Sequence, residues 1–187
     1  MLLVTPTRFV LGIDLASRYS AAVLWDAQGG QVVTEFDSVG QDAASWVGLL
    51  CGVAHGMTKP IVVVEDVPPR IQWAGPVKRV CRLQGRILQA LPDTPVWFVP
   101  PAIWQRTFEG VWRGKEAGAA AAAERLDYHP PQLVGDPRFE PLGKTPSERK
   151  RLAKKVMSDY VDAFLIAHWA ASQPDLSAAA NIQRGDG

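Results

Sequence analysis

Two aspartates near the C-terminus lie three residues apart in the strongly apolar segment SDYVDAFLIAHW. On a helix, Asp159 and Asp162 project from the same face, about one turn apart. Apolar side chains surround them on nearly every side, which predicts that much of this helix is buried. Two like charges in such surroundings repel each other and lose their hydration, at a cost of several kcal/mol. A bound divalent cation is the simplest way to offset that cost, so the pair is a candidate metal site.

Two more acids stand at the ends of apolar runs. Asp14 closes RFVLGID and Glu65 closes PIVVVE, and both runs predict buried strands. In open α/β sheets, ligands bind where the strands end at their carboxyl edges. Asp66 follows directly, but neighbouring strand residues point to opposite faces, so only one of Glu65 and Asp66 can face a given site.

The four carboxylates together favour phosphodiester chemistry. Hard cations such as Mg²⁺ and Mn²⁺ take oxygen ligands, and a carboxylate cluster can hold two of them about 3.5–4 Å apart, where they activate water and stabilise a leaving oxygen. We therefore expect a site for two Mg²⁺ ions, in which Mn²⁺ can substitute, built from Asp14, Glu65, Asp159 and Asp162. Each acid alone also has an ordinary explanation as a turn former, an exposed strand end or a cap. Asp159, for example, would cap a helix that began at Tyr160.

Basic residues gather in two segments, although the formal net charge is only +1. Residues 67–92 contain no acid, and the segment KTPSERKRLAKK at 144–155 contains one, Glu148. Such blocks are typical of proteins that bind nucleic acids, although each alone is also compatible with a solvated helix face. The residues that we expect to hold DNA phosphates are Arg70, Lys78, Arg79 and Arg82, with Lys144, Arg149 and Lys150 as weaker candidates.

The elements that must position these residues follow from hydrophobic periodicity and turn signals. Strands are expected at 8–16, 60–67 and 96–101, and a hairpin at 20–39 with its turn at 28–30. Helices are expected at 42–56, 76–91, 102–108, 115–126 and 146–172, the last with a break near Ser158. The proline- and glycine-rich stretch at about 127–147 predicts an irregular surface loop. This order of elements predicts an α/β domain with a mixed sheet and a parallel crossover before residues 60–67.

Length and composition favour one ordinary globular domain. The chain has 187 residues, of which 47% are hydrophobic and 21% charged. We expect residues 1–172 to form a single domain and 173–187 a disordered tail. No signal-peptide pattern and no apolar run of roughly 18 residues is apparent, and Cys51 and Cys81 are interpreted as buried free thiols. These features predict a cytoplasmic protein with no membrane partner.

Three segments resemble a known family. GIDLASRYSAAVLWD, VVVEDVPP and DYVDAFLIAHW look like the three acidic motifs of the RuvC-type Holliday-junction resolvases, members of the ribonuclease H-like nuclease superfamily. The order and spacing match from about residue 9 to 171. The resemblance implies a five-stranded mixed sheet with an antiparallel second strand, flanked by helices. It also implies a homodimer that uses two Mg²⁺ ions to cut four-way junctions and other branched DNA.

The resemblance also suggests roles for single residues. Asp14 would bridge both metals, Glu65 and Asp162 would complete the two coordination shells, and Asp159 would be a further or outer ligand. Lys115 falls near the family's active-site lysine and would contact the scissile phosphate or orient water, unless it only adds solubility. The long loop at 127–145 and the basic segment after it look more like the bacteriophage branch of the family. The aromatic wedge of the bacterial form has no direct counterpart here, and Trp73 is the candidate for stacking on unpaired bases, with core or interface packing as its alternative.

Other functions remain open from the sequence. A sugar-kinase or actin-like ATPase also begins with a strand ending in GID, but it requires a second domain and glycine-rich phosphate loops. A non-catalytic module that binds branched DNA would need the acids only as caps and ion pairs. Within the nuclease class, flap or fork cleavage and cleavage of RNA–DNA hybrids are further alternatives.

Overall fold

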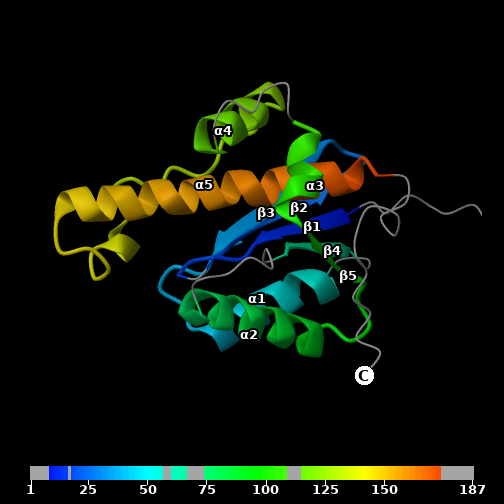
Figure 1. Cartoon of the computed structure of the whole chain (residues 1–187), viewed down its shortest axis with the longest axis horizontal. Helices are drawn as coiled ribbons and strands as arrows, with labels where there is room; N and C mark the ends of the chain where they lie inside the picture. Colours follow the sequence, from blue (N-terminus) through cyan, green and yellow to red (C-terminus); the bar gives the residue numbers. More distant parts are fainter. Residues whose placement is uncertain (1–8, 17, 57–59, 67–73, 109–114, 174–187) are drawn as a thin grey trace, which may run out of the picture.

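A five-stranded sheet lies at the centre of the computed structural model, which describes residues 9–16, 18–56, 60–66, 74–108 and 115–173 (Figure 1). The strand order is β3-β2-β1-β4-β5. β1 pairs antiparallel with β2 and parallel with β4, β2 pairs antiparallel with β3, and β4 pairs parallel with β5. The strands are β1 (Phe9–Asp14), β2 (Ala21–Asp26), β3 (Gln31–Asp37), β4 (Ile61–Glu65) and β5 (Val96–Val99). The expected mixed sheet, its antiparallel second strand and its parallel crossover are confirmed.

Helices cover both faces of the sheet. α1 (Ala43–Gly56) and α2 (Ala74–Ala90) lie on one face, and α3 (Pro101–Arg106), α4 (Lys115–Arg125) and α5 (Pro146–Ala171) lie on the other (Figure 1). Strand residues alternate between two cores: Val10 of β1 packs in the cluster that contains α5, whereas Leu11 and Ile13 pack with α1 and α2. Even-numbered positions of β1 therefore face α5. This alternation decides which carboxylates of the strands can lie on the same face of the sheet as α5.

Helix α5 lies directly on β1 because the strand has a glycine at the crossing point. A Cβ atom on Gly12 would come within 2.2 Å of the Ala163 carbonyl oxygen and 2.7 Å of the Ala167 nitrogen. No side chain fits at such a distance, since nonbonded heavy atoms approach to about 3.5 Å. The alanines on the helix and the glycine on the strand thus bring the two backbones into contact.

Two expectations about the C-terminal third of the chain were wrong. α5 runs without a break through Ser158, from a capping box in which Thr145 and Glu148 bond to each other's backbone N–H groups. Asp159 therefore lies inside the helix and does not cap it. The preceding loop is also not confined to the surface, because Tyr128 and Phe139 are buried.

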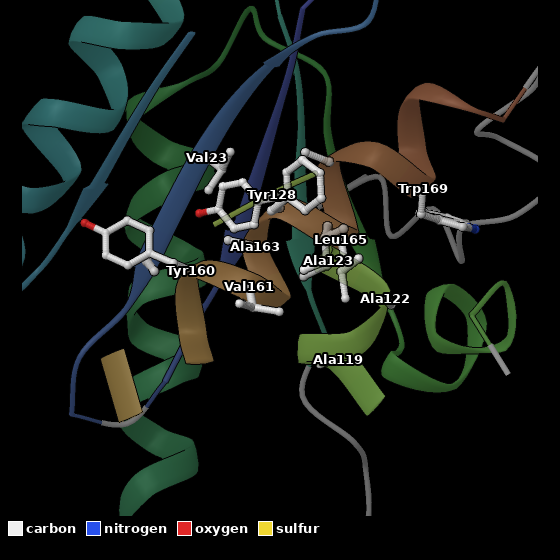
Figure 2. Packing of buried hydrophobic residues seen from close by; sticks show 14 of the residues in the cluster. Val23, Ala119, Ala122, Ala123, Tyr128, Tyr160, Val161, Ala163, Leu165 and Trp169 are labelled. Carbon is white, nitrogen blue, oxygen red and sulfur yellow. The ribbon is translucent and has the colours of Figure 1, made fainter. Parts of the chain in front are cut away.

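The loop contributes to the core through stacking on α5. The Tyr128 ring stacks on Phe164, with 4.1 Å between centroids and 9° between planes, and Figure 2 shows Tyr128 among the side chains of α5 and β2. A short 3₁₀ helix, η1 (Pro137–Phe139), interrupts the loop. Of the two cysteines, Cys51 is half-buried and Cys81 is exposed, so the expectation that both are buried was wrong. Among the described helices, none combines the length and hydrophobicity that crossing a membrane requires.

Candidate active site

Asp14 and Glu65 are placed side by side by the register of β1 and β4. Ile13 pairs with Val64 in this parallel ladder, so Asp14 and Glu65 occupy the next step at the carboxyl ends of both strands. Alternation turns both side chains toward α5, as it does Val10 and Val63 in the same two strands. Asp66 is the next residue, and the same alternation turns it toward the opposite face. The expectation that only one of the two adjacent acids faces the site thus selects Glu65.

Helix α5 brings Asp159 to Asp14. The contact of Ala163 with Gly12 fixes the helix on β1, and Asp159 lies one turn earlier, where it reaches the end of the strand. The carboxyl groups of Asp14 and Asp159 are within hydrogen-bonding range of each other. Asp159 is only 1% exposed and Asp14 only 7%. Burial, followed by the negative charge of Asp14, raises the pKa of Asp159 well above its ordinary value.

Lys155 compensates the paired carboxylates, and sequence reasoning did not single it out. Its Nζ donates to Asp159 Oδ1 from one helical turn away. Burial alone would lower the pKa of Lys155, but the negative charges of Asp159, Asp14 and Asp162 together raise it. Lys155 therefore interacts with three of the four predicted acids. The i, i+4 spacing to Asp159 was visible in the sequence, although it did not show which face of the helix is buried.

Glu65 is held from the neighbouring helix α3. The Trp104 indole Nε1 donates to Glu65 Oε2 at 3.2 Å, and Trp104 is fully buried. Because α3 begins immediately after β5, the chain places this indole beside the end of β4. Sequence reasoning missed Trp104, because the spacing between residues 65 and 104 carries no signal of contact.

The donor set fits a hard divalent cation in its chemistry. Asp159 Oδ2 is buried and has no hydrogen-bond donor, although a buried carboxylate oxygen requires a proton donor or a cation. The neighbouring groups are carboxylates, which are the ligands that Mg²⁺ and Mn²⁺ prefer. Within the described residues, however, no three His, Cys, Asp or Glu side chains stand close enough to ligate one ion. The ammonium group of Lys155 lies beside Asp159 and supplies part of the positive charge that a bound cation would supply there.

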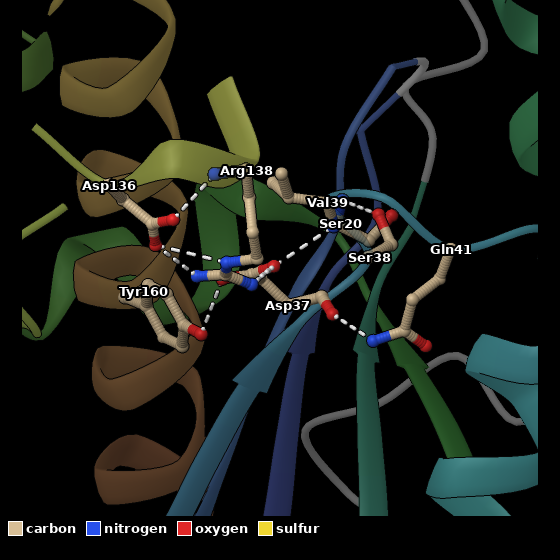
Figure 3. A network of polar contacts seen from close by, with 8 residues as sticks. All are labelled: Ser20, Asp37, Ser38, Val39, Gln41, Asp136, Arg138 and Tyr160. Carbon is tan, nitrogen blue, oxygen red and sulfur yellow. Dashed lines mark hydrogen bonds and ion pairs between the residues drawn. The ribbon is translucent and has the colours of Figure 1, made fainter. Parts of the chain in front are cut away.

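A buried polar network fixes the rotation of α5 about its axis. The Tyr160 hydroxyl donates to Asp37 Oδ2 at 2.9 Å, at the end of β3 (Figure 3). Arg138 from the long loop donates to both Asp37 oxygens, at 2.9 and 3.3 Å, and also pairs with Asp136. Since Tyr160 follows Asp159 directly, the same bond that orients Tyr160 keeps Asp159 aimed at β1. The loop thus contributes to the geometry of the site.

The predicted basic residues divide into three groups. Lys78, Arg79 and Arg82 are exposed on α2. Lys144, just before α5, and Lys150, near the start of α5, are also exposed. Arg149 is half-buried, because its stem packs against Gly143 and a Cβ there would lie 2.7 Å from Arg149 Cγ. Arg70 and Trp73 lie outside the described residues, as does the side chain of Lys115, the first residue of α4.

The structure is similar to that of RuvC. RuvC from Thermus thermophilus superposes with a TM-score of 0.56 and 17% identity, over 92% of this chain and 98% of that chain. T. thermophilus RuvC in complex with a Holliday junction substrate gives a TM-score of 0.57 and 17% identity, over 87% and 92%. The large terminase nuclease from thermophilic phage G20c superposes less closely, with a TM-score of 0.48 and 13% identity over 86% and 80%. No protein-family model matches the sequence, and curated proteins gave no significant match.

At 17% identity, the structural similarity establishes the fold, and the activity has to be argued from the site. The similarity extends over most of both chains, and the strand order and helix placement agree with the expectation from the acidic motifs. The chain therefore has the ribonuclease H-like α/β fold of RuvC, a five-stranded mixed sheet flanked by helices.

Proposed function

We propose that the chain is a metal-dependent endonuclease that hydrolyses phosphodiester bonds in Holliday junctions and other branched DNA. The meeting of Asp14 and Asp159 in a buried site carries the proposal, because two distant segments deliver carboxylates to one point at the edge of the sheet. Such a pair is unfavourable for stability, and its cost is understandable if a functional cation binds there. The T. thermophilus RuvC found with a Holliday junction substrate supports the substrate class.

Asp14, Glu65, Asp159 and Asp162 would hold the divalent ions. When bound, two such ions lower the pKa of water and stabilise the leaving oxygen of a phosphodiester. The chain's own residues orient the site: Trp104 fixes one oxygen of Glu65 by its indole N–H. Asp159 lies within α5, and one of its oxygens accepts from Lys155 Nζ.

Two lysines serve the substrate phosphate in this proposal. Lys155, whose side chain is 56% exposed, reaches from Asp159 to solvent and can neutralise a phosphate that enters the site. Lys115, the first residue of α4, keeps its predicted role as a contact of the scissile phosphate. A homodimer with twofold symmetry would place one such site on each of two symmetry-related strands of a four-way junction.

The test uses two adjacent acids as a matched pair: Glu65, the last residue of β4, and Asp66, which follows it. Glu65→Gln removes a ligand on the α5 face, whereas Asp66→Asn changes a neighbour on the other face. Purified variants and Asp14→Asn are incubated with four-way junctions, flaps and RNA–DNA hybrids in Mg²⁺ or Mn²⁺. We expect Glu65→Gln and Asp14→Asn to lose cleavage by at least ~100-fold while binding junctions normally, and Asp66→Asn to stay within a few-fold of wild type.

Other outcomes select other functions. If no substrate is cut in either metal, the chain is a DNA-binding module. Cleavage of flaps or hybrids in preference to junctions would retain the nuclease and replace the substrate. Sedimentation of the protein with junction DNA tests the dimer, and a complex that contains one protein chain would exclude paired nicks by a dimer.

A further inference from the structure

Three grooves adjoin one another on the surface that leads away from the carboxylates. The first, of about 810 Å³, runs along α5 and α4 and is lined by Lys150, Arg151 and Lys155 among others. The second, of about 240 Å³, shares Arg151 and Leu152 with the first. The third, of about 340 Å³, lies between α2 and the start of α1. Arg18 lines both the second and the third groove, so each groove shares a lining residue with the next, and we call the three together the basic band.

The basic band concentrates positive charge. Nine basic residues and two acidic residues line its three grooves, in a chain whose 20 lysines and arginines nearly balance 19 acids. Both acids are engaged in capping helices. Asp42 accepts from the Ser45 backbone N–H at 2.7 Å, and Glu148 accepts from the backbone N–H groups of Lys144 and Thr145. The band therefore presents a strongly positive surface to a ligand.

Arg18 joins two basic segments that are far apart in the sequence. On one side it shares a groove with Arg79, Arg82 and Arg86 of α2. On the other it shares a groove with Lys144 and Arg151 at the start of α5. Arg18 is exposed, and its guanidinium lies 5.3 Å from the centre of the Tyr19 ring, which restrains it where β1 leads into β2. Sequence reasoning treated the two segments as separate and did not consider Arg18.

The basic band ends at the candidate active site. Lys155 lines the first groove and pairs with Asp159, whereas Lys144 lines the second groove eleven residues earlier. Lys144 precedes the N-cap of α5, and Lys155 lies roughly 14 Å along the axis from the first helical residue, Pro146, which is about four phosphate steps of one DNA strand. A ligand lying in the band would thus run from the α2 side, past Arg18, to the carboxylates.

The lining distinguishes a duplex from a single strand. Binding of single strands relies on exposed aromatic side chains on which bases stack. Among the described residues that line these grooves, the aromatic one is Trp46, which is 1% exposed and unavailable for stacking. The described lining thus offers arginines and lysines, which suit the phosphates of a duplex, because these are bound without reading the bases.

We propose that the basic band holds the phosphate backbone of one double-stranded DNA arm, with Arg18 as the residue that makes the α2 and α5 segments a single site. This inference rests on the proposed function, since it assigns the path by which an arm of a branched substrate reaches the carboxylates. It requires one duplex to contact both segments at once.

The experiment measures binding without cleavage. Fluorescence anisotropy with a 20-base-pair duplex in EDTA, over a series of salt concentrations, gives the dissociation constant and its salt dependence. Arg18→Gln, Arg82→Gln and Lys150→Gln should each weaken binding of this duplex about five- to tenfold near 0.1 M salt and reduce the salt slope by about one. The matched control is Arg125→Gln, because Arg125 is exposed at the end of α4 and lines none of the three grooves; it should bind like wild type.

Each result decides the inference. If Arg18→Gln binds the duplex like wild type, the inference fails. It also fails if two duplexes bind per chain and Arg82→Gln and Lys150→Gln each abolish a different one, because the α2 and α5 segments are then separate sites. A single strand of equal length that binds more tightly than the duplex also overturns it. Circular dichroism confirms that each variant is folded. If the duplex binds as expected but no substrate is cut, the proposed nuclease function is refuted and the inference about the basic band stands. If wild type cuts its substrate and Arg18→Gln cuts it equally well, the nuclease function stands and the inference about the basic band fails.

Discussion

The contact between Gly12 and α5 makes Gly12→Ala an informative perturbation of both the fold and the site. The added methyl group would lie 2.2 Å from the Ala163 carbonyl oxygen and 2.8 Å from Ala167 Cβ. Backbone atoms on both sides of the contact cannot turn away as a flexible side chain can. The helix must therefore retreat by roughly 1 Å before the oxygen and the methyl reach ordinary contact.

The expected cost follows from that displacement. Overpacking a well-packed core costs about 1–3 kcal/mol, and the lower chain entropy of alanine returns about 0.5–1 kcal/mol. We expect Gly12→Ala to lose about 1–2 kcal/mol of the free energy of unfolding. A displacement of about 1 Å between Asp14 and Asp159 should lower the cleavage rate by about 100-fold.

Gly48→Ala is the matched control, because Gly48 is exposed in α1 and a Cβ there meets nothing within 4 Å. Alanine at that helical position should raise the free energy of unfolding by about 0.5–1 kcal/mol and leave cleavage unchanged. Urea unfolding and junction cleavage measure both effects. If Gly12→Ala is as stable and as active as Gly48→Ala, α5 does not rest on β1 at this point, and the geometry of the site is wrong.

Three further substitutions test the surroundings of the site. Lys155→Met leaves buried Asp159 without its ammonium partner, so urea unfolding in EDTA should show a loss of about 1–3 kcal/mol, which the double variant with Asp159→Asn should recover. Trp104→Phe removes the N–H that orients Glu65, and we expect cleavage to fall while stability changes by less than about 1.5 kcal/mol; unchanged cleavage would mean that this bond does not position the acid. Burial raises the pKa of Glu35 above 4.5 despite the hydrogen bond from Tyr128, so folding favours the protonated form of this acid. The stability that Glu35 contributes at low pH is therefore lost as the pH rises through the pKa of the folded state. Glu35→Gln should therefore gain stability over wild type between about pH 4 and 7 in denaturation measured across pH, and a constant difference would refute the shift.

The sheet and its acids were predictable because they depend on short-range patterns. Continuous apolar runs that end in a carboxylate predicted β1 and β4. Strand alternation allowed only one of Glu65 and Asp66 to face the site, and the family resemblance favoured Glu65. Helical spacing predicted that Asp159 and Asp162 share a helix. These signals are local, and the parallel pairing of β1 with β4 then follows from the crossover.

The remaining features depend on long-range packing. Prolines and glycines made the loop before α5 look like a surface segment, although stacking on Phe164 buries Tyr128. Trp104 reaches Glu65 only because β5 lies beside β4. The same applies to Arg18, since no spacing shows that a residue after β1 lies between α2 and α5. The predicted roles of Arg70 and Trp73 stay predictions.

Helix α5 touches the sheet most closely near Gly12, so a tilt of the helix about this contact moves its two ends by different distances. Its N-terminal half extends past the sheet (Figure 1), whereas Asp159 lies close to this contact. Ser147 is roughly 24 Å from Ala163 along the axis and Asp159 roughly 6 Å, so a tilt of about 5° would move the far end by about 2 Å and the carboxylate by about 0.5 Å. In the proposed endonuclease, such a tilt would move the basic residues at the start of α5 against a DNA arm while the carboxylates keep nearly the same position.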